Sequence, residues 1–166
     1  MGAFETLVIH CSDSNFGDAK LIDSWHKQRG WKGIGYSLVI PNGYIINSND
    51  YEKEKDGIIQ NGRGIDFTNT IEPDEIGAHT LGLNSTSAGI CLIGINEFSI
   101  NQYKTLYYIC KTFQQLNPDI NIIGHYETEK AHGKTCPNII MSDWRELLES
   151  GAYTLDLDIR SKMVVS

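Results

Sequence analysis

The chain has 166 residues, of which 40% are hydrophobic and 21% are charged, so it is long enough for one packed domain and lacks the composition of a disordered protein. Its formal net charge of −7 disfavours nucleic acid and anionic membrane surfaces as partners, because both attract clustered Lys and Arg. The apolar runs are far shorter than the roughly 20 residues that cross a bilayer, so no membrane insertion is expected.

The chain begins with a predicted strand and a predicted helix. Residues 6–10 (TLVIH) form a short apolar run that is typical of a central strand. Asp18 can cap a helix whose apolar residues recur at helical spacing, and Gly30 ends that helix.

A hairpin and a polar insertion are expected next. Residues 36–46 contain two apolar runs on either side of Asn42 and Gly43, and this pair favours a tight hairpin turn. Residues 47–69 are polar and charged, and they predict an extended insertion with a further strand near residues 58–59.

The second half of the chain alternates buried strands with helices. Residues 89–94 and 120–123 are continuous apolar runs, as in strands that are covered on both faces of a sheet. A capping-box pattern at Ser99 precedes an amphipathic helix that ends near Asn117, and residues 142–149 predict a last short helix.

This alternation predicts an α/β fold with residues 1–150 as one domain. The expected core is a central sheet flanked by helices. Residues 151–166 form a C-terminal tail in which apolar and acidic residues alternate, so the tail is expected either to add an edge strand or to lie on the surface.

Two histidines and one cysteine are candidates for a metal centre. His10 ends the first strand, His125 follows the last strand, and Cys136 comes eleven positions later. Two imidazoles and a thiolate are a zinc ligand set, and three protein ligands leave the fourth tetrahedral position open to water. The spacing matches no compact metal motif, so on spacing alone a strand-end histidine, a surface histidine and a packed thiol are the more ordinary explanation. The other three cysteines are expected to be buried thiols.

Several segments resemble one enzyme family. In chain order they are residues 8–12 (VIHCS), 22–31 (IDSWHKQRGW), 35–40 (GYSLVI), 77–79 (GAH), Asn84, 89–94 (GICLIG), 124–127 (GHYE) and 133–137 (GKTCP). They resemble the zinc-dependent N-acetylmuramoyl-L-alanine amidases, the type 2 amidase family that includes phage lysozyme-type amidases and peptidoglycan recognition proteins. The resemblance covers residues 6–148 and implies a single amidase-like domain with a central mixed β-sheet flanked by helices.

The resemblance implies that His10, His125 and Cys136 bind zinc, which is the one cofactor expected. It also implies that Tyr36 lies beside the metal and that Lys134 faces the reacting amide. A lysine there can stabilise the negative oxygen of a tetrahedral intermediate, and a phenol can orient water or donate a hydrogen bond to that oxygen. The alternatives for these two residues are a half-buried strand aromatic and a solvated loop charge.

Other residues carry weaker expectations. His79 matches a position that borders the substrate groove of the family, and both His79 and Asn84 are expected to bind substrate, although His79 is equally well explained as a strand-end histidine bonded to backbone. Arg63 is a further candidate for a substrate contact. His132 lies in a stretch between His125 and Cys136 that is longer than in the phage relatives, and it is an alternative metal ligand or a group near the metal.

The expected function is zinc-dependent hydrolysis of the amide bond between N-acetylmuramic acid and L-alanine in peptidoglycan, by a bacteriolytic phage-type endolysin. One alternative is a peptidoglycan-recognition module that binds the stem peptide without cutting it, and another is a cytoplasmic amidase that recycles muropeptides. Recognition modules commonly lose the cysteine ligand, so the presence of Cys136 favours the enzyme. No secretion signal is visible, so the protein is expected to be cytoplasmic as synthesised, to act on the cell wall or periplasm after release, and to be a monomer.

Overall fold

The computed structural model of the protein describes residues 3–68 and 70–151. Its elements are, in chain order, β1 (Thr6–Cys11), α1 (Ala19–Gln28), β2 (Leu38–Ile40), β3 (Asn42–Tyr44), β4 (Tyr51–Asp56), β5 (Gln60–Asn61), β6 (Ser87–Leu92), α2 (Ile100–Leu116), β7 (Asn121–Gly124), the short 3₁₀ helix η1 (His125–Glu127) and α3 (Met141–Ser150). This order confirms the expected α/β class. The strand that the tail was expected to add falls in residues 152–166, outside the described residues.

Five strands form the central sheet in the order β5-β2-β6-β1-β7. Strand β1 pairs in parallel with both β6 and β7, β2 pairs in parallel with β6, and β5 runs antiparallel to β2. The sheet is therefore mixed, as expected. Because parallel strands end at the same edge of a sheet, the residues that follow β1, β6 and β7 meet at one edge.

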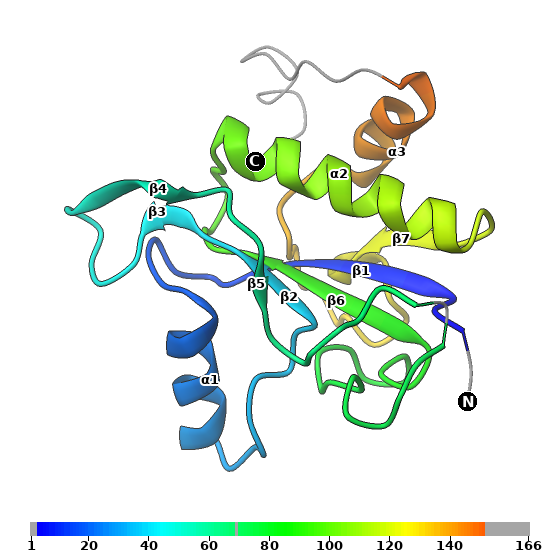
Figure 1. Ribbon diagram of the computed structural model, residues 1–166, viewed down its shortest axis with the longest axis horizontal. Helices are drawn as coiled ribbons and strands as arrows, with labels where there is room; N and C mark the ends of the chain where they lie inside the picture. The colour runs from blue at the N-terminus through cyan, green and yellow to red at the C-terminus, as the bar shows by residue number, and fades with distance from the viewer. Residues whose placement is uncertain (1–2, 69, 152–166) are drawn as a thin grey trace.

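Helices and loops cover both faces of this sheet. Figure 1 shows α2 and α3 on one side and α1 with the long connection between β5 and β6 on the other. Leu7 and Ile9 of β1 belong to the larger apolar core under α2 and α3. Side chains alternate along a strand, so the neighbouring His10 points to the opposite face. A second, smaller core on the α1 side surrounds Ile22.

Two of the predicted helix starts are confirmed by their caps. The Asp18 carboxylate accepts a hydrogen bond of 2.8 Å from the backbone N–H of Leu21 at the start of α1. At the start of α2, Ser99 and Gln102 form a capping box. The buried Gln102 amide also donates to the carbonyl oxygens of Ile40 and Ile93, at 2.8 and 2.9 Å. The helix is thereby attached to the sheet where β2 and β6 end.

The predicted hairpin around Asn42 and Gly43 is wrong. These residues begin β3, which pairs with β4 in a separate two-stranded sheet, whereas β2 pairs with β6 and β5. Gly43 does use a positive φ of 87°, but the reason is packing. A Cβ atom on Gly43 would lie 2.3 Å from Cε2 of Tyr51, whose ring lies against the glycine. Glycine at this position therefore allows β3 and β4 to approach each other closely and does not form a turn.

The polar insertion is more ordered than expected. Residues 51–56 form β4 and residues 60–61 form β5, on either side of Gly57, instead of one strand near residues 58–59.

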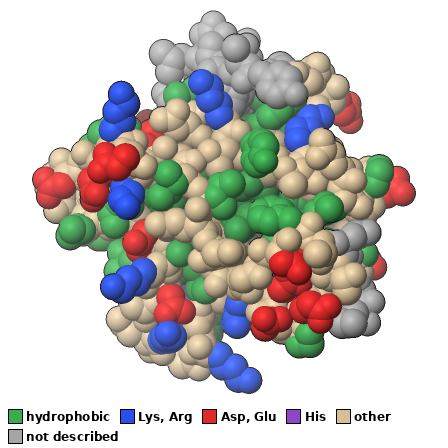
Figure 2. Space-filling model, in the orientation of Figure 1, with side chains coloured by type: hydrophobic (Ala, Val, Ile, Leu, Met, Phe, Trp, Pro, Cys, Tyr) green, Lys and Arg blue, Asp and Glu red, His purple; other side chains and the backbone are tan. Residues whose placement is uncertain are grey.

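Charged side chains are interspersed on the face drawn in Figure 2, and Lys and Arg alone cover no large area of that face. Within the described residues, no helix combines the length and apolarity needed to cross a membrane.

Candidate active site

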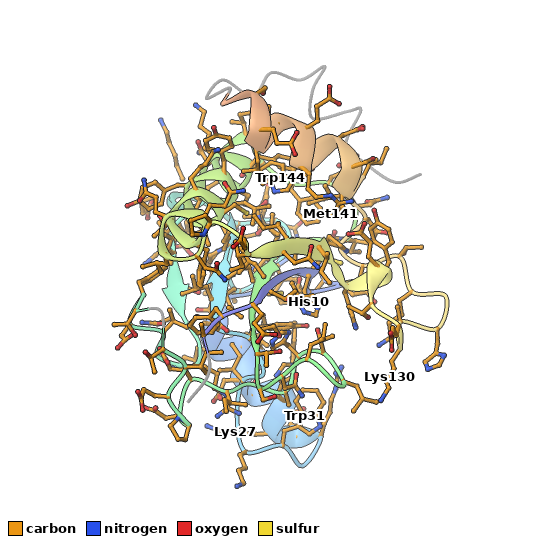
Figure 3. All side chains as sticks on the ribbon, turned by 90° about the vertical axis from the view of Figure 1, so that its right-hand side faces the viewer. His10, Lys27, Trp31, Lys130, Met141 and Trp144 are labelled. Carbon is orange, nitrogen blue, oxygen red and sulfur yellow. The ribbon has the colours of Figure 1, made fainter. Side chains whose placement is uncertain are left out.

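Three side chains gather where β1 and β7 end. The possible ligand atoms of His10, His125 and Cys136 all lie within 4.8 Å of one another, and among the described residues they form the one such group of His, Cys, Asp or Glu. The His10 and His125 rings are 4.6 Å apart between centroids, and His10 Nδ1 lies 4.0 Å from Cys136 Sγ. The structure thus brings together the three ligands that the sequence predicts. In Figure 3, His10 lies between Met141 on one side and Trp31 and Lys130 on the other.

The strand register explains how the two histidines meet. Ile9 of β1 is paired with Gly124 of β7, so the residues that follow them in the two parallel segments, His10 and His125, stand side by side. Gly124 is needed for close packing here, because a Cβ atom would lie 2.9 Å from both Met141 and Pro137. His10 is fully buried in the sheet, whereas His125 is half-buried.

Cys136 is held at the site by backbone contacts. Its carbonyl oxygen accepts a hydrogen bond of 2.8 Å from the N–H of Tyr126 in η1. Its sulfur accepts one of 3.2 Å from the N–H of Cys11 at the end of β1. The loop of residues 127–135 therefore leaves and returns at nearly the same place, and Cys136, which follows it, is fixed against η1 and the end of β1.

The protonation states of the three groups suit metal ligands. Burial lowers the pKa of His10 well below 6.5, and the neighbouring His79, His125 and Lys134 lower it further. Burial, followed by the charge of Lys134, also lowers the pKa of His125. Both imidazoles are therefore neutral at pH 7 and offer a lone pair. The Cys11 thiol and burial raise the pKa of Cys136, so a nearby cation is needed to favour its thiolate.

Tyr36 lies directly beside His10. Their rings are 5.0 Å apart between centroids, so Tyr36 neighbours one of the candidate metal ligands. Burial raises the pKa of Tyr36 well above 10, so its phenol stays protonated and can donate a hydrogen bond.

An open cleft of about 300 Å³ adjoins the three-residue group. His125 belongs to both, and Lys134 lies on the cleft wall with its side chain exposed. The large exposed side chains of Trp31 and Leu81 supply apolar surface. The remaining residues that line the cleft are Ala78, His79, Thr80, Asn84, Thr128 and Lys130. Of these wall residues, Leu81, Thr80, Thr128 and Lys130 were not predicted, because loop residues carry no periodic signal.

His79 and Asn84 reach the cleft wall, but their polar atoms have partners within the protein. His79 is 9% exposed, and its ring nitrogens contact His10, Thr80 and Ser87. Asn84 Oδ1 accepts hydrogen bonds from the backbone N–H groups of His79 and Thr80, at 3.0 and 2.8 Å. These contacts indicate that both residues shape the site.

The two weaker candidates lie elsewhere. His132 is exposed on the loop before Cys136 and is absent from the three-residue group. Arg63 is half-buried beside Gly77 and is not among the residues that line the cleft.

Comparisons with known proteins identify the family of this chain. A family model of N-acetylmuramoyl-L-alanine amidases matches residues 2–139. The chain belongs to this family. The endolysin of Enterobacteria phage K11 is 26% identical to this amidase over 147 residues, which are 82% of this chain and 82% of the relative.

Solved structures show the same fold. The endolysin amidase LysCS from Clostridium intestinale has 26% sequence identity and a TM-score of 0.61, and the match covers 82% of this chain and 76% of that one. Drosophila PGRP-LB, at 24% identity and a TM-score of 0.60, covers 82% of this chain and 76% of its own. The expected amidase and peptidoglycan-recognition fold is thereby confirmed.

Proposed function

We propose that this amidase hydrolyses the bond between the lactyl group of N-acetylmuramic acid and L-alanine in peptidoglycan, with zinc held by His10, His125 and Cys136. The convergence of three ligand atoms within 4.8 Å beside an open cleft carries the proposal. His125 and Lys134 connect the group to the cleft, so a bound amide can reach both.

The donor set fits zinc. Two imidazole nitrogens and one sulfur are typical zinc ligands, whereas calcium and magnesium prefer oxygen. Tetrahedral zinc, with bonds of about 2.0 Å to nitrogen and 2.3 Å to sulfur, places its ligand atoms about 3.5 Å apart. The 4.0 Å between His10 Nδ1 and Cys136 Sγ needs only a small contraction to reach that value. Three ligands also leave a position open.

Each residue of the site has a distinct part in the reaction. When bound, zinc supplies a Lewis acid that polarises the amide carbonyl and acidifies water. The Lys134 ammonium would stabilise the oxygen that becomes negative as the amide is attacked. The Tyr36 phenol, protonated at neutral pH, would donate a hydrogen bond to the same oxygen or to the attacking water. Trp31 and Leu81 would hold apolar parts of the substrate.

The biological role follows the curated relatives. The endolysins of phages K11 and T7 match more than four fifths of this chain, which favours a phage-type lysin over a recycling enzyme. Such a protein would reach the cell wall after its release from the cytoplasm. All residues of the site come from one chain, which supports a monomer as the active unit.

The decisive experiment is incubation of purified peptidoglycan with zinc-loaded protein, chelator-treated protein and the Cys136→Ala variant. New L-alanine amino ends with intact sugar chains, released by the zinc-loaded protein alone, are the expected result. Mass spectrometry of the products identifies the bond that is cut. Tight binding to the wall without any new amine would contradict the proposal and indicate a recognition module.

A further inference from the structure

The two ring nitrogens of His10 face different neighbours. Nδ1 lies 4.0 Å from Cys136 Sγ, on the side of the predicted metal ligands. Nε2 lies 3.1 Å from Nδ1 of His79, on the opposite side of the ring. A metal can bind Nδ1 only if that atom carries a lone pair, so the hydrogen of the neutral ring must be on Nε2.

The contacts of Ser87 determine which nitrogen of His79 carries hydrogen. Ser87 Oγ donates its single hydrogen to the carbonyl oxygen of Leu83, at 2.7 Å. Ser87 Oγ and the Ser87 carbonyl oxygen lie 3.3 and 3.4 Å from His79 Nε2, and both can then only accept. The hydrogen of the His79 ring is therefore on Nε2. In the neutral ring, His79 Nδ1 is left as an acceptor.

This acceptor in turn determines which ring nitrogen of His10 carries the hydrogen. His10 Nε2 must donate to His79 Nδ1, which leaves His10 Nδ1 with its lone pair toward Cys136. Thr80 Oγ1, at 3.0 Å from His79 Nδ1 and 3.3 Å from His10 Nε2, can instead relay this bond by accepting from His10 Nε2 and donating to the one lone pair of His79 Nδ1, and the hydrogen of His10 is then again on Nε2. His10 is 1% exposed and His79 is 9% exposed, so water competes little for these bonds.

We propose that His79 is a positioning residue that holds His10 in the tautomer required for metal binding. This role differs from the substrate contact expected from the sequence, and it rests on the metal centre proposed above. The packing supports it, because a Cβ atom on Gly89 would lie only 2.6 Å from Cγ of His79. Glycine in β6 thus lets the imidazole lie directly on the sheet. The Asn84 side chain holds the backbone of His79 and Thr80 in place by accepting a hydrogen bond from each N–H.

The test compares zinc affinities, measured by competition with a chromophoric chelator. His79→Phe keeps a ring but removes both nitrogens, and it should weaken zinc binding by about 10–100-fold, as the loss of a hydrogen bond behind a metal ligand does. His79→Asn places an amide oxygen close to the position of Nδ1, so it should bind zinc nearly as tightly as wild type. His79→Gln extends its amide toward the Nε2 position and lacks that acceptor, so it should bind as weakly as the Phe variant.

A spectroscopic measurement separates this role from a general loss of structure. In zinc-free wild type and His79→Asn, the ¹⁵N shifts of the His10 ring should show hydrogen on Nε2 alone, whereas His79→Phe should show a mixture of tautomers. Circular dichroism identifies a variant that does not fold, and His79→Gln then takes the place of His79→Phe. Equal zinc affinity and an unchanged His10 tautomer in the folded variant would overturn the inference. Failure of the wild type to bind zinc would instead overturn the proposed function.

Discussion

The Nδ1 atom of His26 accepts a hydrogen bond of 2.9 Å from the backbone N–H of Gly35, the residue before Tyr36. The His26 ring also lies 4.5 Å from the Trp31 ring between centroids and 5.6 Å from the Tyr36 ring. The buried His26 of α1 therefore contacts both Tyr36, beside the proposed metal site, and Trp31 of the cleft wall. His26 acts on the site through these neighbours.

Replacement of His26 by Leu should destabilise the protein. The substitution leaves the buried N–H of Gly35 without its acceptor, so the free energy of unfolding should fall by about 1–3 kcal/mol. The turnover number should fall as well, because Tyr36 is no longer held beside His10. Urea denaturation and amidase assays measure the two effects. His26→Asn, which retains an acceptor near the position of Nδ1, is the matched control and should lose less; an unchanged stability in His26→Leu would contradict the role of this bond.

Cys136→Ala should abolish stoichiometric zinc binding and amide cleavage, because one of three ligands is removed. Cys110→Ala is the matched control, since Cys110 is a fully buried thiol in the core between α2 and α3. This control should retain one zinc per chain. Metal content after dialysis, measured by atomic emission, distinguishes the two variants. Full zinc occupancy in Cys136→Ala would show that another residue completes the site.

Lys134→Ala should lower kcat by about 100–1,000-fold, the effect of removing one group that stabilises a negative oxygen in the transition state. Zinc affinity should change little, because Lys134 is exposed and outside the ligand group. Steady-state kinetics on a soluble muropeptide measure the loss. Lys104→Ala, on the exposed side of α2, controls for the change in net charge and should have wild-type kinetics. A change in KM alone would assign Lys134 to substrate binding.

The stability of the metal-free protein should depend on pH through its buried histidines. Burial lowers the pKa of His79 from 6.5 to about 4 and lowers the pKa of His10 well below 6.5. Between pH 6.5 and about pH 4, the unfolded chain therefore binds more protons than the folded one. The stability is therefore complete above pH 6.5 and falls as the pH decreases toward 4, by about 3 kcal/mol for His79 alone.

Urea denaturation of chelator-treated protein at several pH values in this window measures the effect. His79→Asn should give a flatter curve than wild type, because it lacks one of the titrating rings. His132→Ala, which alters an exposed ring, should reproduce the wild-type curve. A wild-type stability that is constant across the window would show that the buried rings do not titrate with unfolding.

Local signals predicted most of the fold. The cap at Asp18 and the capping box at Ser99 gave the starts of α1 and α2 because such signals need only neighbouring residues. Strand pairing was less accessible. One partner of β2 is β6, about fifty residues further along the chain, and no pattern near Asn42 indicates that choice. The Asn-Gly pair was therefore assigned to a turn.

The sequence predicted which residues gather at the site better than it predicted the contacts between them. Strand ends and the family resemblance indicated His10, His125 and Cys136, which the structure brings together. The resemblance did not give the direction of the His79 ring, and Ser87 has no distinguishing signal in the sequence. Both depend on the packing of the connection between β5 and β6 over the sheet, which is a tertiary contact. Their roles became visible only in three dimensions.

The hydrogen bond between Tyr126 N–H and the Cys136 carbonyl has a consequence for how this enzyme can diversify. The bond closes the loop of residues 127–135 at its base, and Thr128, Lys130 and Lys134 of this loop line the cleft. Insertions or deletions inside the loop reshape one wall of the cleft while His125 and Cys136 stay where the two strands hold them. A change in loop length can therefore alter the substrate preference of the cleft while the proposed metal ligands stay in place.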